Sequence, residues 1–190
     1  QVIVACDFFV VVTAAFRTLH VFVMMEVGSR RILHYNVTSH PTADWAEQQF
    51  REALPGGHAY RFLIHDRDSI FSKELDKEVS AMGVKVLRTL VRAPKGNSVC
   101  ERFGGTMRRE CFDYLIPFNE RHLRYVLKAW IAHFNSARPH MSLGPGIPSG
   151  LLALVPHDEH RHCIAHGYAV RRVAVLGGHH REYRLEKAAA

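Results

Sequence analysis

Three acidic side chains occupy positions where a carboxylate can do chemistry. Asp7 interrupts an apolar first strand, Asp66 directly follows a short apolar run, and Glu101 falls in the first turn of a predicted helix. An ionised carboxylate in an apolar strand is costly unless it is paired, protonated or bound to a cation. For Asp7, a salt bridge to Arg17 or a strand-end position open to water are the alternatives to cation binding.

The other two carboxylates also have simpler explanations. Ligand sites in open α/β sheets gather at the carboxyl ends of strands, so we favour Asp66 over Asp68 in the following loop, although either can be a turn or capping residue. Ser98-x-x-Glu101 has the spacing of a capping box, with Asn97 or Ser98 as the cap. Local chemistry alone leaves both alternatives open.

The three carboxylates would repel one another if the fold brought them together without cations. Divalent ions between them would remove that repulsion, and hard carboxylate oxygens suit Mg²⁺ or Mn²⁺. A pair of such ions can stabilise the attacking and leaving oxygens of an in-line displacement at phosphorus. The chemistry of such a site is the cutting or joining of phosphodiester bonds.

The predicted elements place these residues in an α/β protein. Three strands, then alternating helices and strands, predict a mixed five-stranded sheet in which a three-strand antiparallel meander joins parallel strands, flanked by helices. Apolar periodicity predicts strands over 2–12, 18–27, 31–38, 61–64 and 84–89, and helices over 42–54, 72–82, 97–111 and about 120–134.

Four blocks of sequence, in order, resemble one known family. They are Asp7 in its apolar strand, HDRDSIFS (65–72), APKGNSVCERFGGTMRREC (93–111) and WIAHFNSARPHMSLG (130–144) followed by Pro148. This pattern resembles the integrase catalytic core of retroviral-type integrases and bacterial insertion-sequence (DDE) transposases. The 35 positions from Asp66 to Glu101 (101 − 66) are close to the spacing of that family.

The resemblance implies an RNase H-like fold over residues 1–150 and a metal-dependent polynucleotidyl transferase. It implies that Asp7, Asp66 and Glu101 are the catalytic, metal-binding triad, with a pair of Mg²⁺ or Mn²⁺ ions as cofactors. The expected partners are DNA, both mobile-element ends and target DNA, and further copies of the chain in a homo-oligomer. The expected location is the bacterial cytoplasm.

Some features depart from the family pattern. Many members have Gly where this chain has Asp68, and neither a zinc module nor a helix-turn-helix precedes the first strand, which leads us to expect a truncated chain. The alternative hypothesis is therefore a catalytically inactive integrase-core remnant that binds DNA non-specifically.

Basic residues surround Glu101 in sequence. The chain has 25 Lys and Arg against 18 Asp and Glu, a formal charge of +7, which favours an anionic partner. On a helix, Arg108 lies seven positions after Glu101 and so on nearly the same face, where it could neutralise a DNA phosphate; a solvated basic face is the alternative. The candidate DNA-binding residues are Lys95, Asn97, Arg102, Arg108 and Arg109.

The remainder, residues 151–190, reads as a basic tail rich in His and Arg, with a small hairpin predicted around Gly177-Gly178. Its cluster of four His and Cys163 has the wrong order for the zinc module of the family. The four cysteines lack a CxxC pair, which indicates reduced thiols and no structural zinc site. The first apolar run is too short to span a bilayer, so no membrane association is expected.

Overall fold

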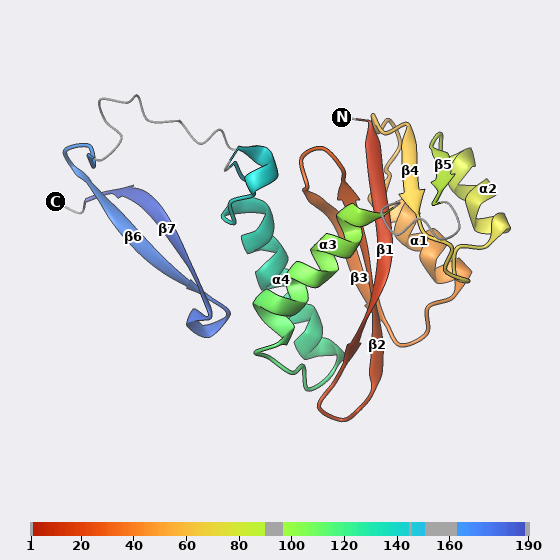
Figure 1. Cartoon of the computed structure of the whole chain (residues 1–190), viewed down its shortest axis with the longest axis horizontal. Coiled ribbons are helices and arrows are strands. Elements are labelled where there is room, and N and C mark those ends of the chain that lie inside the picture. Colours follow the sequence, from red (N-terminus) through yellow and green to blue (C-terminus); the bar gives the residue numbers. More distant parts are fainter. Residues whose placement is uncertain (1, 90–96, 145, 151–162, 189–190) are drawn as a thin grey trace. The chain divides into compact units, whose positions relative to one another are not determined.

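The computed structural model describes residues 2–89, 97–144, 146–150 and 163–188 (Figure 1). The chain forms two compact units, Gln1–Tyr125 and Val126–Ala190. The division at residue 150 predicted from the sequence stays a prediction. Within the described residues, none of the helices combines the length and the apolar composition needed to cross a bilayer.

The first unit is built on a five-stranded mixed sheet with the strand order β3-β2-β1-β4-β5. Strands β1, β2 and β3 are antiparallel to one another, whereas β4 is parallel to both β1 and β5. This arrangement confirms the predicted fold class. The strands are β1 (Ile3–Val12), β2 (Thr18–Glu26), β3 (Ile32–Thr38), β4 (Phe62–His65) and β5 (Lys85–Arg88).

The side chains of successive residues in β1 point to opposite faces of the sheet, as in any β-strand. Val4 and Cys6 belong to a buried cluster shared with α1 (Ala43–Ala53) and α2 (Lys73–Ala81). On the other face, the Phe9 ring meets Phe103 of α3 (Ser98–Met107) with centroids 6.4 Å apart. Figure 1 shows α3 running across this face of β1. Asp7 therefore faces the side of the sheet covered by α3.

Thr42 and Ser72 cap the first two helices. Thr42 accepts a hydrogen bond from the backbone nitrogen of Trp45 at 3.2 Å, and Ser72 accepts one from Leu75 at 3.1 Å. Each bond satisfies one of the amide groups left unpaired at a helix start. After α2 the chain turns through Gly83, whose φ of +91° suits glycine.

The second unit contains the end of α4 (Glu120–Ser136), which begins in the first unit, and a two-stranded hairpin. Strand β6 (Tyr168–Val175) pairs antiparallel with β7 (His180–Lys187). The connecting turn contains Gly177 and Gly178, both with positive φ, at the position the sequence indicated. The short helices η2 (Met141–Leu143) and η4 (Leu176–Gly178) also lie in the second unit, whereas η1 (Arg108–Phe112) lies in the first.

Candidate active site

Asp7 lies on β1, and Asp66 directly follows the neighbouring parallel strand β4. β1 and β4 pair from Ile3 with Phe62 to Ala5 with Ile64. Continuing this register by two residues sets Asp7 opposite Asp66. The pairing of β1 with β4 thus meets the condition under which the carboxyl end of β4 brings Asp66 near Asp7, and the charge of Asp66 acts on Asp7.

The loop after β4 contains both aspartates that the sequence offered for the candidate site, Asp66 and Asp68. Asp66 Oδ1 accepts a hydrogen bond from the amide of Asp68 at 3.0 Å, and Asp68 Oδ1 accepts one from the amide of Ile70 at 3.0 Å. Both carboxylates therefore help to form the turn, which was the simpler alternative for each. Asp66 is half-buried and Asp68 exposed, so Asp66 is the one nearer to the sheet.

A buried histidine fixes the end of β4. His65 is 1% exposed, its Nε2 lies 3.0 Å from Asp76 Oδ1, and its Nδ1 lies 2.5 Å from the carbonyl oxygen of Asp66. Arg88 of β5 donates to the second oxygen of Asp76. This chain of bonds holds the backbone that carries Asp66. These contacts could not be recognised from the sequence, because only the fold brings α2 and β5 to this strand end.

Glu101 is not part of a capping box in this structure. The cap position of α3 is held by Asn97, whose side chain makes no capping hydrogen bond. Asn97 is 4% exposed and instead donates from Nδ2 to the carbonyl oxygen of Cys6 at 2.9 Å. The start of α3 is thereby attached to β1 one residue before Asp7. Glu101, in the first turn, is exposed, with its carboxylate free of the capping role.

The charges of neighbouring acidic residues act on Asp7. The pKa of Asp7 is raised to about 7, first by burial and then by the negative charge of Asp66; the amide of Phe8 lowers it, and Glu101 and Asp68 raise it further. Among the described residues no cation pairs with Asp7, so the predicted alternative of a salt bridge to Arg17 is wrong. Asp7 is a half-buried carboxylate in a field of negative charge.

This donor set fits a hard divalent cation, because carboxylate oxygens that repel one another are stabilised by a positive charge between them. Among the described residues, no three His, Cys, Asp or Glu side chains are arranged to hold a metal ion. A shared ion would therefore require at least one side chain to move. Glu101, exposed and on the first turn of α3, has the most freedom to do so.

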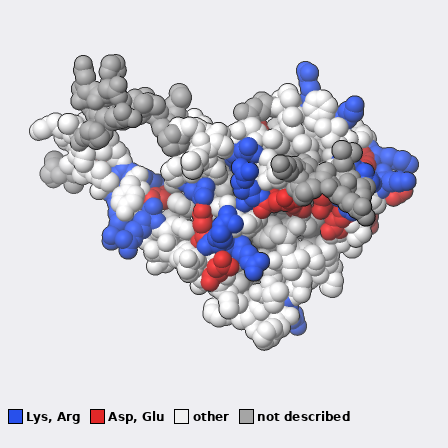
Figure 2. Space-filling view, in the orientation of Figure 1, with Lys and Arg blue, Asp and Glu red and all other residues white. Residues whose placement is uncertain are grey.

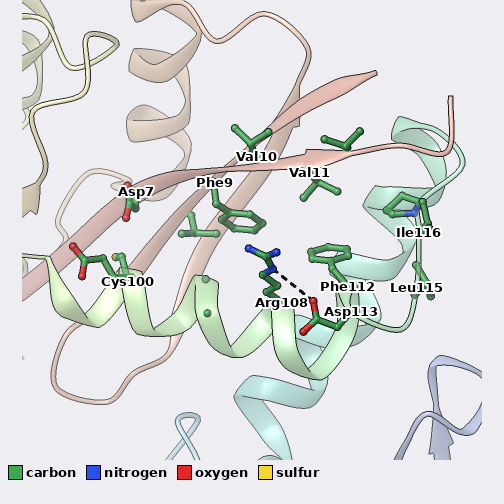
Figure 3. A pocket seen from close by; sticks show the side chains of 16 residues that line it. Asp7, Phe9, Val10, Val11, Cys100, Arg108, Phe112, Asp113, Leu115 and Ile116 are labelled. Atoms are coloured by element: carbon green, nitrogen blue, oxygen red, sulfur yellow. Dashed lines mark ion pairs between the residues drawn. The ribbon is translucent and has the colours of Figure 1, made fainter. Parts of the chain in front are cut away.

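A cavity of about 570 Å³ extends from Asp7 and Glu101 along β1. Figure 3 shows the Asp7 side chain pointing from β1 toward α3, near Cys100, and the apolar side chains of β1 continuing the wall. Burial raises the pKa of the Cys100 thiol well above its ordinary value, so this thiol is neutral. The remaining lining residues include Phe9, Val10, Val11, Gly104, Arg108, Phe112 and Ile116.

One family model matches part of the chain. Residues 82–148 match the integrase core domain family. No curated protein matches the sequence. The matched segment includes Glu101 and the Arg-Pro-His block at 138–140 but leaves out Asp7 and Asp66.

Solved structures resemble a larger part of the chain. The catalytic core domain of BIV integrase has 15% identity and a TM-score of 0.56, over 77% of this chain and 90% of that one. The HTLV-2 integrase catalytic core domain in complex with magnesium has 13% identity and a TM-score of 0.61, over 78% and 93%. The fold is that of an integrase catalytic core. A simian T-cell lymphotropic virus intasome also matches, with 12% identity and a TM-score of 0.61, over 96% of this chain and 66% of that one.

The basic residues of this integrase core fold differ in their surroundings. Asn97 is buried, which does not suit the predicted DNA contact, and Lys95 lies outside the described residues. Arg102 and Arg108 are exposed. Arg109 reaches back along the helix, where Nη2 lies 3.4 Å from Thr106 Oγ1. In the view of Figure 2, Lys and Arg side chains lie beside Asp and Glu side chains.

Arg108 stands where the helix changes its pitch. Helix α3 ends at Met107, and a π-helical turn, η1, begins at Arg108. Arg108 Nε lies 3.6 Å from Asp113 Oδ1, and the dashed line in Figure 3 marks this ion pair at the rim of the cavity. The predicted shared face with Glu101 agrees with the cavity lining, but neither the π-helical turn nor Asp113 could be recognised from spacing alone.

The Arg-Pro-His block of the core fixes the end of α4. The Arg138 guanidinium carbon lies 5.8 Å from the centroid of the Phe134 ring, and the His140 ring meets the same ring edge-on at 4.5 Å. The backbone nitrogen of Arg138 donates to the carbonyl of His133. These contacts hold the chain that leaves α4 against the last turn of the helix.

Proposed function

We propose that the chain is a metal-dependent polynucleotidyl transferase of the DDE type, acting on DNA in cleavage and strand transfer. The nearness of Asp66 and Glu101 to Asp7 carries the proposal: both negative charges raise the pKa of Asp7, and Asp7 and Glu101 line the same cavity. The three carboxylates come from β1, from the end of β4 and from α3. In this fold β1 pairs with β4, and α3 packs on β1. Asp7, Asp66 and Glu101 would hold the ions.

The proposed reaction has two steps at phosphorus. In the first, water attacks a phosphodiester, the P–O3′ bond breaks, and a 3′ hydroxyl is left on the donor strand. In the second, that hydroxyl attacks a phosphodiester of target DNA, forming a new P–O bond as the target strand's own 3′ oxygen leaves. Divalent cations, when bound, supply the positive charge that stabilises the attacking and leaving oxygens.

The chain's own residues position the DNA in this proposal. Arg102 and Arg108 are exposed near Glu101, and Lys or Arg side chains that neutralise phosphates place a strand without reading its sequence. Arg108 is the stronger candidate because it lines the same cavity as Asp7 and Glu101. Arg109 contributes less, since its guanidinium lies against Thr106.

The proposed partners are mobile-element ends, target DNA and further copies of the chain, in the cytoplasm of a bacterium. The HTLV-2 integrase cores that resemble the chain are described as dimeric and trimeric forms in complex with magnesium. Assembly into a homo-oligomer on DNA is accordingly part of the proposal.

The deciding experiment compares Asp66→Asn with Asp44→Asn, an exposed carboxylate in the first turn of α1. Each protein is incubated with Mg²⁺ or Mn²⁺ and DNA carrying nicks or free ends. We expect cleaved or joined products with the wild type and Asp44→Asn, and none with Asp66→Asn. Electron paramagnetic resonance of Mn²⁺ provides a second readout, in which only Asp66→Asn weakens ion binding.

The inactive DNA-binding remnant gives the opposite pattern. It predicts salt-dependent DNA binding in all three proteins, no products with either metal, and no difference in Mn²⁺ binding between Asp66→Asn and Asp44→Asn. That pattern from correctly folded proteins would reject the proposed function.

A further inference from the structure

The hairpin of the second unit has two chemically different faces. Residues directly opposite each other on paired antiparallel strands share a face, and the face alternates along each strand. Four pairs share one face, which we call the docking face: Ala169 with Glu186, Arg171 with Arg184, Val173 with Glu182, and Val175 with His180. The opposite, open face is formed by Tyr168, Val170, Arg172, Ala174, Arg181, Tyr183, Leu185 and Lys187.

The docking face contacts α4 within the same unit. Glu182 is 8% exposed, and its Oε1 lies 3.0 Å from His133 Nδ1. The His133 and His180 rings stack with centroids 5.0 Å apart. Because Glu182 is buried with hydrogen-bonded partners, this contact selects which face of the hairpin is covered.

The acidic residues of the two strands are both neutralised on the docking face. Arg184 donates to Glu182 Oε2 at 2.7 Å, and Arg171 donates to Glu186 Oε2 at 3.2 Å. β6 and β7 contain no other Asp or Glu. The positive charges of the open face therefore face solvent without an acidic residue of either strand beside them.

The open face combines these charges with large exposed apolar side chains. Tyr183 is 66% and Leu185 is 56% exposed, with Tyr168 and Val170 also exposed. Among the described residues no ion pair involves Arg172, Arg181 or Lys187. Basic and apolar side chains are interspersed along this face: Arg172 lies opposite Tyr183, Val170 opposite Leu185, and Tyr168 opposite Lys187.

Charge complementarity decides what kind of partner fits this surface. A solvated basic face does not need two tyrosines and two aliphatic side chains, and an apolar protein partner would leave three cations to be desolvated. Nucleic acid with unpaired bases offers phosphates to Arg and Lys, and base faces on which tyrosine rings can stack. In duplex DNA those base faces are hidden in the stack.

We propose that the open face of the hairpin binds single-stranded DNA. The site lies outside the carboxylate cluster and uses none of its residues; it rests on the proposed function only for the choice of DNA as the nucleic acid. Tyr168 and Tyr183 stack on bases, and Arg172, Arg181 and Lys187 contact the phosphates.

The test compares two neighbouring arginines of β6, Arg172→Gln on the open face and Arg171→Gln on the docking face. Both variants lose one positive charge, so any effect of net charge is equal. Binding of a fluorescent single-stranded oligonucleotide is measured with EDTA in an Asp66→Asn background, so that the catalytic proposal does not influence the result. We expect Arg172→Gln to weaken binding by roughly threefold or more and to lower the salt dependence, and Arg171→Gln to change it far less.

A second pair of variants tests the stacking. Tyr183→Ala should weaken binding by roughly fivefold or more, whereas Tyr183→Phe, which keeps the ring, should bind like the wild type. Circular dichroism checks that each variant is folded. Equal effects of Arg171→Gln and Arg172→Gln, equal affinity for duplex and single-stranded DNA, or a change of oligomeric state with Tyr183→Ala in place of weaker binding would each overturn the proposal.

Discussion

Asn97 joins the start of helix α3 to strand β1 through a 2.9 Å hydrogen bond from its Nδ2 to the carbonyl oxygen of Cys6. The bond is buried and connects residues 91 positions apart in the chain. Its acceptor directly precedes Asp7, and its donor lies four residues before Glu101. One side-chain amide therefore sets the position of the helix that carries the third carboxylate relative to the strand that carries the first.

Replacing Asn97 should loosen this connection. Asn97→Ala leaves the buried carbonyl of Cys6 without its donor, so we expect the free energy of unfolding in urea to fall by about 1–3 kcal/mol. Ser98→Ala is the matched control, because Ser98 is the first residue of α3 and the cap position belongs to Asn97. If Ser98→Ala were as destabilising as Asn97→Ala, a capping role for Ser98 would have to be restored.

Asp7 should make stability depend on pH in the absence of divalent cations. Its pKa is about 7 in the folded protein and 3.8 for the ordinary group. Between these values the folded state binds the proton more tightly, so the free energy of unfolding falls as pH rises from about 4 to about 7 and levels off above. Asp7→Asn removes this fall and should be more stable than the wild type at pH 8 by about 2–4 kcal/mol.

Urea unfolding of both proteins in EDTA, at several pH values from acid to neutral, measures this effect as the difference between them. Other titrating groups act on both proteins and cancel in the difference. A difference that stays constant over the whole range would show that Asp7 titrates normally.

Asp76 should matter for stability although it is remote from the reacting groups in sequence. It lies 3.0 Å from the buried His65 and also accepts from Arg88. Asp76→Ala leaves both partners without their acceptor, and we expect a loss of about 2 kcal/mol in the free energy of unfolding. Glu78→Gln, at an exposed position of the same helix, should change it by less than about 0.5 kcal/mol. Equal effects of the two substitutions would argue against the network.

Arg108 should affect DNA binding and leave stability nearly unchanged. Its ion pair with Asp113 spans 3.6 Å and its side chain is 80% exposed, and pairs exposed to solvent contribute little to stability. Arg108→Gln should weaken duplex binding roughly threefold and reduce the salt slope by about one. Arg51→Gln is the matched control, since Arg51 pairs with Glu47 on the surface of α1. The same loss with Arg51→Gln would mean that net charge alone governs binding.

Much of the architecture follows from local pattern. The β-branched apolar runs of β1 and β2 favour strands, and Thr42 and Ser72 cap α1 and α2, as suits their residue types. The order of the elements restricts the sheet to a meander joined to parallel strands. Asp7 and Asp66 could be selected because a carboxylate in an apolar strand, or at a strand end, is costly or useful wherever the chain folds. Glu101 was selected only through the resemblance to the integrase core, since its spacing from Ser98 also fits a capping box.

The tertiary structure decided what each polar side chain does. Asn97 is a cap residue by type, yet its amide bonds Cys6, because the fold places a buried carbonyl within its reach. Asp113 meets Arg108 only because the helix widens into a π-helical turn. The two faces of the hairpin differ because Glu182 is hydrogen-bonded to His133 of α4, which covers the docking face and leaves the basic, aromatic face exposed. Hydrophobic period is a local property that the sequence determines by itself, whereas the partner of a polar group is chosen by residues far away in the chain.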